Sequence, residues 1–445
     1  MADADATEGG PTGGGEPDPF DAFRQVVALP GDVLVLSAAM FAFSLGFQAT
    51  GRYLPEYLSV LGASSLAIGL FGSVGNLISA VFPYPGGALS DRLGSRTSLT
   101  LFGLASTLGF LVWWAADPVR DVAVGPTNLA VVLVFCGLFL SQAWKSLGLG
   151  ATFAVLKQSV PPDRLASGFA ATETFRRTAF LLGPLVAAGV LSAYAFAAGF
   201  RLILLGAAVA GAVGTVAQYR LYDAANDSLG KSFDGVATAV SDLRSLPDTL
   251  RPLLVADTLV RFANGMVYVF FVIVVVERGV GATLPVVGAL SPAAYFGVLL
   301  GVEMAVALVT MLPVARLARR VGLKPVVGLG FAVYALFPVL LIVAPADPAA
   351  YAALFAFSGL RFAGLPAHKA LIVGPAEADA GGRVTGTYYL VRNVVTVPSA
   401  LAGGWLYARD PTLAFGLATA VGLVGVAYFA ARGREFAAYA PGGSR

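Results

Sequence analysis

The sequence predicts an all-α membrane protein with twelve transmembrane helices in two pseudo-symmetric six-helix bundles. The 445-residue chain is 57% hydrophobic and only 12% charged, whereas a soluble chain carries about 25% charged residues. Apolar runs of about 20 residues, the length that crosses a bilayer as a helix, recur along the whole chain. Two short charged segments, GALSDRLGSR at 87–96 and ARLARRVGLK at 315–324, lie 228 residues apart. This separation is about half of the chain and indicates two halves built on one plan.

The polar breaks between apolar runs define the predicted helices. Their spans are 33–58, 65–89, 97–116, 128–156, 167–193, 199–221, 252–276, 291–316, 324–344, 349–374, 384–407 and 412–431. Residues 31–221 are predicted to form the N-terminal bundle, 222–251 a polar connecting loop and 252–432 the C-terminal bundle. Residues 1–30 are predicted to be a disordered tail, because their start is rich in Gly, Pro, Asp and Glu. Residues 433–445 form the second tail.

Basic residues predict the orientation. Short cytoplasmic loops of membrane proteins carry an excess of Lys and Arg, and here the excess follows the even-numbered helices. It includes Arg92, Arg96, Arg164, Arg220, Arg244, Arg316, Arg319, Arg320, Lys324 and Arg383. Both tails are therefore expected in the cytoplasm, and the protein in the cytoplasmic membrane. The start of the chain lacks the apolar core of a cleaved signal peptide, so the first helix is expected to remain.

The repeat extends beyond the two charged segments. KSLGLGA at 145–151 matches RFAGLPA at 361–367 with a shift of 216. The same shift places Arg176 on Arg392, Gly183-Pro184 beside Ser399-Ala400, and Ala187-Ala188 beside Gly403-Gly404. Several matches in the same order favour a parallel duplication.

The segment at 87–96 resembles the loop motif of the major facilitator superfamily of secondary transporters, G-x-L-a-D-r-x-G-r-k. The matching residues are Gly87, Leu89, Ser90, Asp91, Arg92, Gly94 and Arg96, while Ser95 replaces the first closing basic residue. The resemblance covers roughly 30–432 and implies the fold of that family. It also implies alternating access, in which a central site opens to one side of the membrane at a time.

The motif predicts a gate. Gly87 would let two helices cross closely, and Gly94 would allow the loop to reverse direction. The resemblance implies that Asp91 latches the N-terminal half to the start of helix eleven, where Arg383 is a candidate partner. Arg319 stands in the equivalent place of the second half, which therefore cannot form the mirror-image latch. The alternative is that Asp91 only sets topology in a solvated loop.

Helix five carries GPLVAAG at 183–189. Proton-driven drug exporters of the family have a Gly-Pro followed by paired glycines, and here Ala187-Ala188 replace that pair. The alternative is that Gly183 and Pro184 serve only helix packing and bending.

Charged residues within membrane helices are costly and mark candidate functional sites. The candidates are the cations Lys145, Arg176, Arg261, Arg361 and Arg392, the acids Glu173, Asp257 and Glu303, and the amides Gln48 and Asn264. Lys145 with Arg361 and Arg176 with Arg392 occupy duplicated positions, which suits a polar network at the inner gate. Glu173 lies three residues before Arg176, and Asp257 four before Arg261, so each pair can neutralise locally. The alternative is that the cations converge on an anionic solute.

Glu303 is the first candidate for proton coupling, because no basic residue lies within four positions and an apolar setting favours proton exchange. Asp257 is the second. The alternative is a permanently protonated Glu303 that is hydrogen-bonded in the core. Two further residues are given structural roles, His368 as an anchor at the membrane interface and Cys136 as a buried packing residue.

These observations predict a secondary transporter for a small organic solute, working as a monomer by proton-coupled efflux. The alternative is proton-coupled uptake of an organic anion or sugar. No G-x-x-x-x-G-K-[ST] segment for ATP binding occurs, and a single histidine argues against an intramembrane enzyme. A transporter-like sensor would need a larger soluble extension. No metal, cofactor or nucleic acid is expected, and the partners are the solute, protons and lipid.

Overall fold

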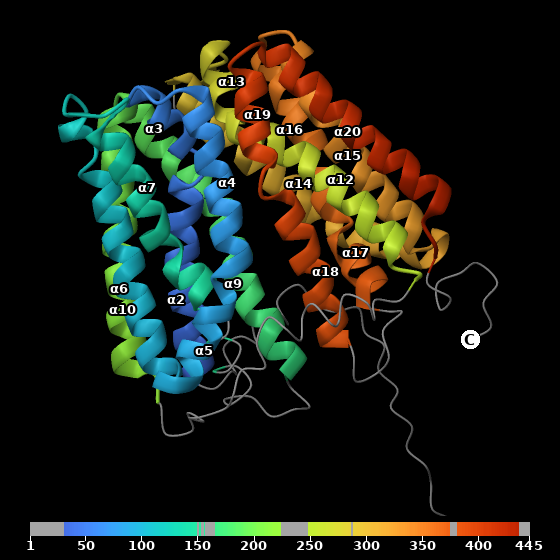
Figure 1. Cartoon of the computed structure of the whole chain (residues 1–445), viewed down its shortest axis with the longest axis horizontal. Helices are drawn as coiled ribbons and strands as arrows, with labels where there is room; N and C mark the ends of the chain where they lie inside the picture. Colours follow the sequence, from blue (N-terminus) through green and yellow to red (C-terminus); the bar gives the residue numbers. More distant parts are fainter. Residues whose placement is uncertain are drawn as a thin grey trace, which may run out of the picture.

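The computed structural model is a helical protein whose two groups of helices lean together at one end (Figure 1). The structure describes residues 31–148, 151–152, 155, 165–223, 248–285, 288–373 and 381–435. Its strands are confined to two hairpins within this part of the chain. We call the end that carries them the hairpin face and the opposite end, with the charged segments at 87–96 and 315–324, the hinge face.

Helices of the first half occupy 31–221. They are α2 (Gly31–Thr50), α3 (Leu54–Val60), α4 (Ser65–Val81), α5 (Pro83–Leu93), α6 (Ser95–Trp114), η1 (Asp117–Val119), α7 (Leu129–Gln142), the π-helical turn η2 (Ala143–Leu147), α9 (Leu165–Ala193) and α10 (Phe196–Leu221). Strands β1 (Ala123–Val124) and β2 (Thr127–Asn128) form the antiparallel hairpin between α6 and α7. Helix α2 packs against α9 and α10, and α6 against α7 and α10.

Helices of the second half occupy 251–432. They are α12 (Arg251–Val267), η4 (Tyr268–Phe270), α13 (Phe271–Glu277), α14 (Pro292–Val321), α15 (Leu323–Val343), α16 (Pro348–Ala363), α17 (Leu365–Val373), α18 (Gly381–Thr396), α19 (Ser399–Tyr407) and α20 (Pro411–Arg432). Strands β3 (Ala282–Leu284) and β4 (Gly288–Leu290) pair antiparallel between α13 and α14. Helix α20 packs against α12 and α15, and α16 against α14 and α15.

The predicted spans correspond to these helices, and several spans are broken. In the described part of the chain, ten helical segments are long and apolar enough to cross a membrane. The bent pair α4 and α5, which meet at 43°, makes an eleventh. The predicted span 384–407 is divided into α18 and α19 around Pro398 and does not qualify by length. A proline cannot donate the backbone hydrogen bond of a continuous helix, which accounts for the break. The twelfth crossing therefore stays a prediction.

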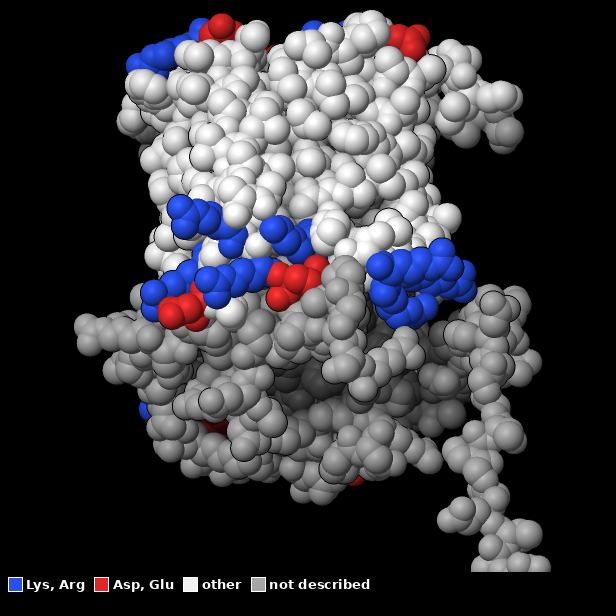
Figure 2. Space-filling view, turned by 90° about the vertical axis from the view of Figure 1, so that its right-hand side faces the viewer, with Lys and Arg blue, Asp and Glu red and all other residues white. Residues whose placement is uncertain are grey.

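The surface agrees with a lipid environment. Large apolar side chains such as Leu104, Val213 and Val309 point outward, with 54%, 62% and 75% of their area exposed. Cys136 on α7 is also exposed, so its predicted burial is wrong. Figure 2 shows a broad band without charged side chains and a cluster of Lys and Arg below it. This distribution is expected where the bilayer surrounds the middle of the molecule.

The two charged segments have the same backbone geometry. Helix α5 ends at Leu93 and α6 begins at Ser95, and 228 residues later α14 ends at Val321 and α15 begins at Leu323. Between them, Gly94 has φ 82° and Gly322 φ 92°, values that favour glycine because it lacks a Cβ. Residues with the same sequence shift therefore form the same sharp reversal in both halves.

The two most extensive helix contacts between the halves are those of α4 with α19 and of α9 with α14, and smaller ones join α4 to α18 and η4 and α3 to α13. At the first contact, a Cβ on Gly69 would meet the Ala400 carbonyl oxygen and approach the Gly404 Cα to 2.9 Å. At the second, a Cβ on Gly297 would lie 2.5 Å from the Pro184 carbonyl oxygen and 2.9 Å from the Ala188 Cβ.

These contacts are copies of one another. Gly297 follows Gly69 by 228 residues, and the 216-residue shift relates Pro184 to Ala400 and Ala188 to Gly404. The sequence repeat thus becomes a pseudo-twofold pair of backbone contacts. Both lie in the half of the molecule nearer the hairpin face, and the ribbons diverge toward the hinge face (Figure 1).

A bulky residue at Gly404 should prevent this closure. A Cβ there would lie 2.6 Å from the Ser65 carbonyl oxygen and 3.0 Å from the Gly69 Cα. Overpacking costs about 1–3 kcal/mol, which shifts a two-state equilibrium by about 5–150-fold. Gly404→Leu is expected to increase labelling of a cysteine introduced between the halves from the hairpin face, measured in a Cys136→Ser background.

Gly75→Leu is the matched control, because Gly75 lies on α4 with open space around its Cβ position. Equal labelling of the two leucine variants would contradict a gating role for the glycine contact.

Candidate functional site

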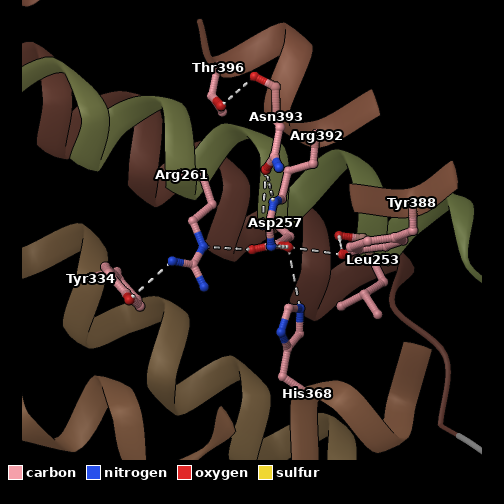
Figure 3. Close-up of polar contacts among 9 residues, drawn as sticks. All are labelled: Leu253, Asp257, Arg261, Tyr334, His368, Tyr388, Arg392, Asn393 and Thr396. Atoms are coloured by element: carbon pink, nitrogen blue, oxygen red, sulfur yellow. Dashed lines mark hydrogen bonds and ion pairs between the residues drawn. The ribbon is translucent and has the colours of Figure 1, made fainter. Parts of the chain in front are cut away.

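Asp257 is the centre of a buried ionic cluster in the second half (Figure 3). Its carboxylate has no exposed area. The Arg261 Nε lies 3.3 Å from Oδ1, and the Arg392 Nη1 lies 3.1 Å from Oδ2. The Tyr388 hydroxyl donates to Oδ2 at 3.1 Å, and the His368 Nε2 lies 3.4 Å from the same oxygen. Asp257 therefore holds α12, α17 and α18 together.

The sequence predicted only the local part of this cluster. Asp257 and Arg261 are one helical turn apart on α12, and the predicted ion pair between them is confirmed. The contribution of Arg392 depends on how α18 packs against α12. His368 is 5% exposed, so its prediction as an interfacial anchor is wrong. Its position one turn into α17, after the break at Gly364, directs the ring inward.

Glu303 has a basic partner from another helix. The Arg361 Nη2 lies 2.7 Å from Glu303 Oε1, and the Ser358 hydroxyl donates to the same oxygen. The Arg361 Nη1 donates to Asn264 Oδ1 at 3.4 Å. Both charged side chains are buried. The expectation of a carboxyl in purely apolar surroundings is therefore wrong, because sequence distance does not reveal a partner 58 residues away.

Tyr334 on α15 connects the two ion-pair groups. The Arg261 Nη1 donates to its hydroxyl at 3.3 Å. The Arg361 guanidinium lies 4.8 Å from the centre of its ring. Both arginines thus contact one aromatic side chain, which links the Asp257 ion pairs to the Glu303 ion pair.

Cations of the first half lie at the side that faces the second half. Arg52 stacks over the Tyr268 ring of η4 at 4.1 Å, and no ion pair joins Arg52 to Glu56 within the described residues. Lys145 is exposed between the buried residues Trp144 and Ser146. Its charge is repelled by those of Arg176 and Arg52. Three positive side chains therefore share one region next to the C-terminal bundle.

The duplicated cations differ in environment. Lys145 and Arg361 are equivalent by the repeat, yet Arg361 is 3% exposed and ion-paired whereas Lys145 is exposed. Arg392 binds Asp257, while its equivalent Arg176 lies over the Phe180 ring at 5.4 Å. Residues at equivalent positions of the repeat therefore have different exposure and different partners in the two halves.

The remaining candidates have packing contacts. A Cβ on Gly183 would lie 2.6 Å from that of Gln48, so helices α9 and α2 touch there. Pro184 faces Gly297 in the contact between the halves. These positions agree with helix packing at the start of the GPLVAAG segment.

The structure describes the residues of the gate motif on α5 and α6. Asp91 is half-buried on α5 and Arg92 is exposed. Arg96 donates to the Tyr219 carbonyl oxygen at the end of α10. The close approach predicted for Gly87 belongs to its neighbour, because a Cβ on Gly86 would overlap Leu147 whereas Gly87 has open space.

Two candidate side chains lie outside the described residues. They are those of Glu173 and Arg383. The predicted latch and the predicted Glu173 ion pair therefore stay predictions.

The hairpin face contains an acidic contact that the sequence did not single out. The Tyr407 hydroxyl donates to Glu277 Oε2 at 2.8 Å. Glu56 on α3 lies near enough for its carboxylate to be repelled by that of Glu277 on α13. Two acids from different halves thus meet where the molecule is closed. Within the described residues, no group of three His, Cys, Asp or Glu side chains could hold a metal ion.

Fold and site together define a class. Two helical bundles with an apolar exterior carry their charges in the interior and near the boundary between the halves. This arrangement is typical of a membrane transport protein, in which polar residues in the bundle interior mark the path of the solute.

The sequence profile of the Major Facilitator Superfamily matches residues 34–294. The chain belongs to this superfamily and is a secondary transporter of its type. Over 391 residues it is 21% identical to an uncharacterized MFS-type transporter of Methanocaldococcus jannaschii. The alignment covers 86% of this chain and 90% of that protein.

Solved transporters share the fold. A crystal structure of the nucleoside transporter NupG has a TM-score of 0.70 at 13% identity, covering 91% of this chain and 100% of that one. The crystal structure of a POT family transporter in complex with 5-aminolevulinic acid has a TM-score of 0.71 at 13% sequence identity. The match covers 92% of this chain and 98% of that one. The crystal structure of a bacterial homologue of the iron transporter ferroportin, in an inward-facing state, has a TM-score of 0.68 at 14% sequence identity. The match covers 90% of this chain and 98% of that one.

Proposed function

We propose that this protein moves a small organic anion across the cytoplasmic membrane together with protons, by alternating access. The observation that carries the proposal is the group of positive side chains, Arg52, Lys145 and Arg176, beside the second half. Within the described residues no acidic side chain is paired with Lys145. Like charges held close together favour an anionic ligand, to which Arg and Lys form strong charge-assisted hydrogen bonds.

Proton coupling is assigned to Glu303. Its carboxylate neutralises Arg361 at 2.7 Å. A proton taken up by Glu303 removes this negative charge and leaves Arg361 able to attract an anion. Proton and anion then favour each other's binding, as linkage requires. Tyr268 of the second half contacts the first region, because the Arg52 guanidinium lies 4.1 Å from the centre of its ring.

This coupling supports proton-linked uptake of an anion better than proton-linked efflux. The sequence favoured efflux because of the helix-five segment, in which Gly183 packs against Gln48. No described contact of that segment involves a titratable group of the ion-pair clusters. The uptake alternative is therefore the one that the geometry supports.

The hinge face is proposed to be the cytoplasmic side. Arg92, Arg220, Arg319, Arg320 and Arg432 lie in the last turns of helices that end there. Positive residues are retained on the cytoplasmic side of short loops. Since the halves meet near the hairpin face and diverge at the hinge face, this structure corresponds to an inward-open state, with a single chain as the working unit.

Transport into proteoliposomes tests the solute class. The panel should contain small carboxylates, phosphorylated sugars, neutral sugars and lipophilic cations. We expect the anions to be transported, and Lys145→Met to raise KM for them about 10–100-fold, since a hydrogen bond to a charged group contributes about 1.5–3 kcal/mol. Lys324→Met is the control, because Lys324 bonds the Ala430 carbonyl oxygen at the hinge face. Transport of lipophilic cations alone, or an unchanged KM in Lys145→Met, would refute the anion proposal.

Glu303→Gln should abolish accumulation driven by a proton gradient but leave exchange of solute for solute. Asp257→Asn provides the comparison. It leaves Arg261 and Arg392 without their carboxylate, and breaking a buried ion pair costs on the order of 3–5 kcal/mol. Its main effect should be a lower Tm. Normal proton-driven accumulation by Glu303→Gln would eliminate this residue as the coupling site.

Asp91 is proposed to latch the hinge face in the other state of the cycle, with Arg383 as its partner. The asymmetry with Arg319 supports a latch from the first half alone. Asp91→Asn should favour the state seen here. A cysteine between the halves should become less accessible from the hairpin face, the opposite of the Gly404→Leu effect. If Asp91→Asn left both the accessibility of this cysteine and transport at wild-type levels, the latch proposal would be refuted, and the motif would serve only to set the topology of the loop.

A further inference from the structure

A small cavity lies inside the second half, between α12, α15 and the break that separates α16 from α17. It is lined by Arg261, Phe331, Tyr334, Arg361, Gly364 and His368, among others. The space open to a water-sized group is about 20 Å³, which suffices for one small occupant. Its residues come from helices of one half, so it is distinct from the region of Lys145 and Arg176.

One polar atom at this cavity, the Arg361 Nε, lacks a hydrogen-bond partner among the described residues. The Arg361 residue is 3% exposed. The nearby His368 is 5% exposed, and its Nε2 has one long contact, 3.4 Å to Asp257 Oδ2. Leaving a buried donor without an acceptor is costly, and more so when the group is charged. A ligand that accepts hydrogen bonds would remove this cost.

The charges indicate the sign of that ligand. The clusters around the cavity contain two carboxylates, Asp257 and Glu303, and three guanidinium groups, Arg261, Arg361 and Arg392. Two negative and three positive charges leave a net charge of +1, even with His368 neutral. Arg361 and both carboxylates are buried, whereas 29% of the Arg261 side chain is exposed. An excess positive charge in such a partly buried cluster favours an anion as its partner. The positive end of α17, which begins at the lining residue Leu365, adds to the same potential.

We propose that this cavity binds one small inorganic anion, chloride, held by Arg261, Arg361 and His368. A single monovalent anion makes the cluster neutral. The space admits one small occupant, and a water molecule would leave the charge uncompensated. The bound ion links α12 and α15 to the α16–α17 break and so stabilises the second half. The site shares Arg361 with the proposed coupling pair and so rests in part on the proposed function, whereas Lys145 and Arg176 do not belong to it.

The matched variants lie on α15. A Cβ on Gly330 meets only the Arg361 carbonyl oxygen, at 3.5 Å, so Gly330→Val fits while its larger side chain fills the cavity. Gly328→Val makes the same change two residues earlier, where a Cβ would lie 3.9 Å from Phe429. Neither variant alters a charge.

The experiment is a chloride titration of the full chain in nanodiscs, with gluconate as the replacement anion. Saturating chloride should raise the Tm of the wild type and of Gly328→Val by about 5 °C, and that of Gly330→Val by no measurable amount. Crystals grown in bromide should show an anomalous peak between Arg261, Arg361 and His368.

A Tm that is independent of chloride in the wild type, or an equal rise in Gly330→Val, would overturn the proposal. So would density for an ordered water only. Lys145→Met separates this site from the solute site, because its chloride response should stay that of the wild type even where anion transport is impaired.

Discussion

Two equivalent helix contacts determine how closely the two halves can approach. In one, Gly69 lies against Ala400 and Gly404, and in the other Gly297 lies against Pro184. In both contacts a glycine lies against the backbone of the opposite helix, at a distance that leaves no room for a Cβ on Gly69 or Gly297. A pseudo-twofold pair of small-residue contacts near one face lets the bundles close there while the other ends remain apart.

The two halves have the same helical plan but differ in how their intramembrane charges are paired. In the second half, Asp257 and Glu303 are buried and bind arginines from other helices. In the first half, Lys145 remains exposed and near other cations. Buried ion pairs stabilise mainly by compensating a desolvation cost that either charge alone would incur. We accordingly propose that the second half holds the proton and the first half attracts the anion, although both halves have the same helical pattern.

Much of the site could be anticipated from residue type, but its pairing could not. Every intramembrane charge was a candidate because its burial is costly, and the i, i+4 pair of Asp257 and Arg261 followed from helix geometry. The partnership of Glu303 with Arg361 did not, since it depends on the packing of α14 against α16. His368 was misjudged for the same reason. A lone histidine near a helix end has no sequence signal that tells an interfacial side chain from one directed at Asp257.

The amino-acid sequence by itself determined the membrane fold, the order of the spans and the duplication, because hydrophobic length and repeated turns are local properties. The glycine turns at Gly94 and Gly322 have matching geometry at the predicted shift of 228. Only the tertiary structure decided which charges meet, which glycine in the Gly86-Gly87 pair contacts a neighbour and where the halves touch. These depend on the rotation and crossing of helices far apart in the chain, which no local pattern encodes.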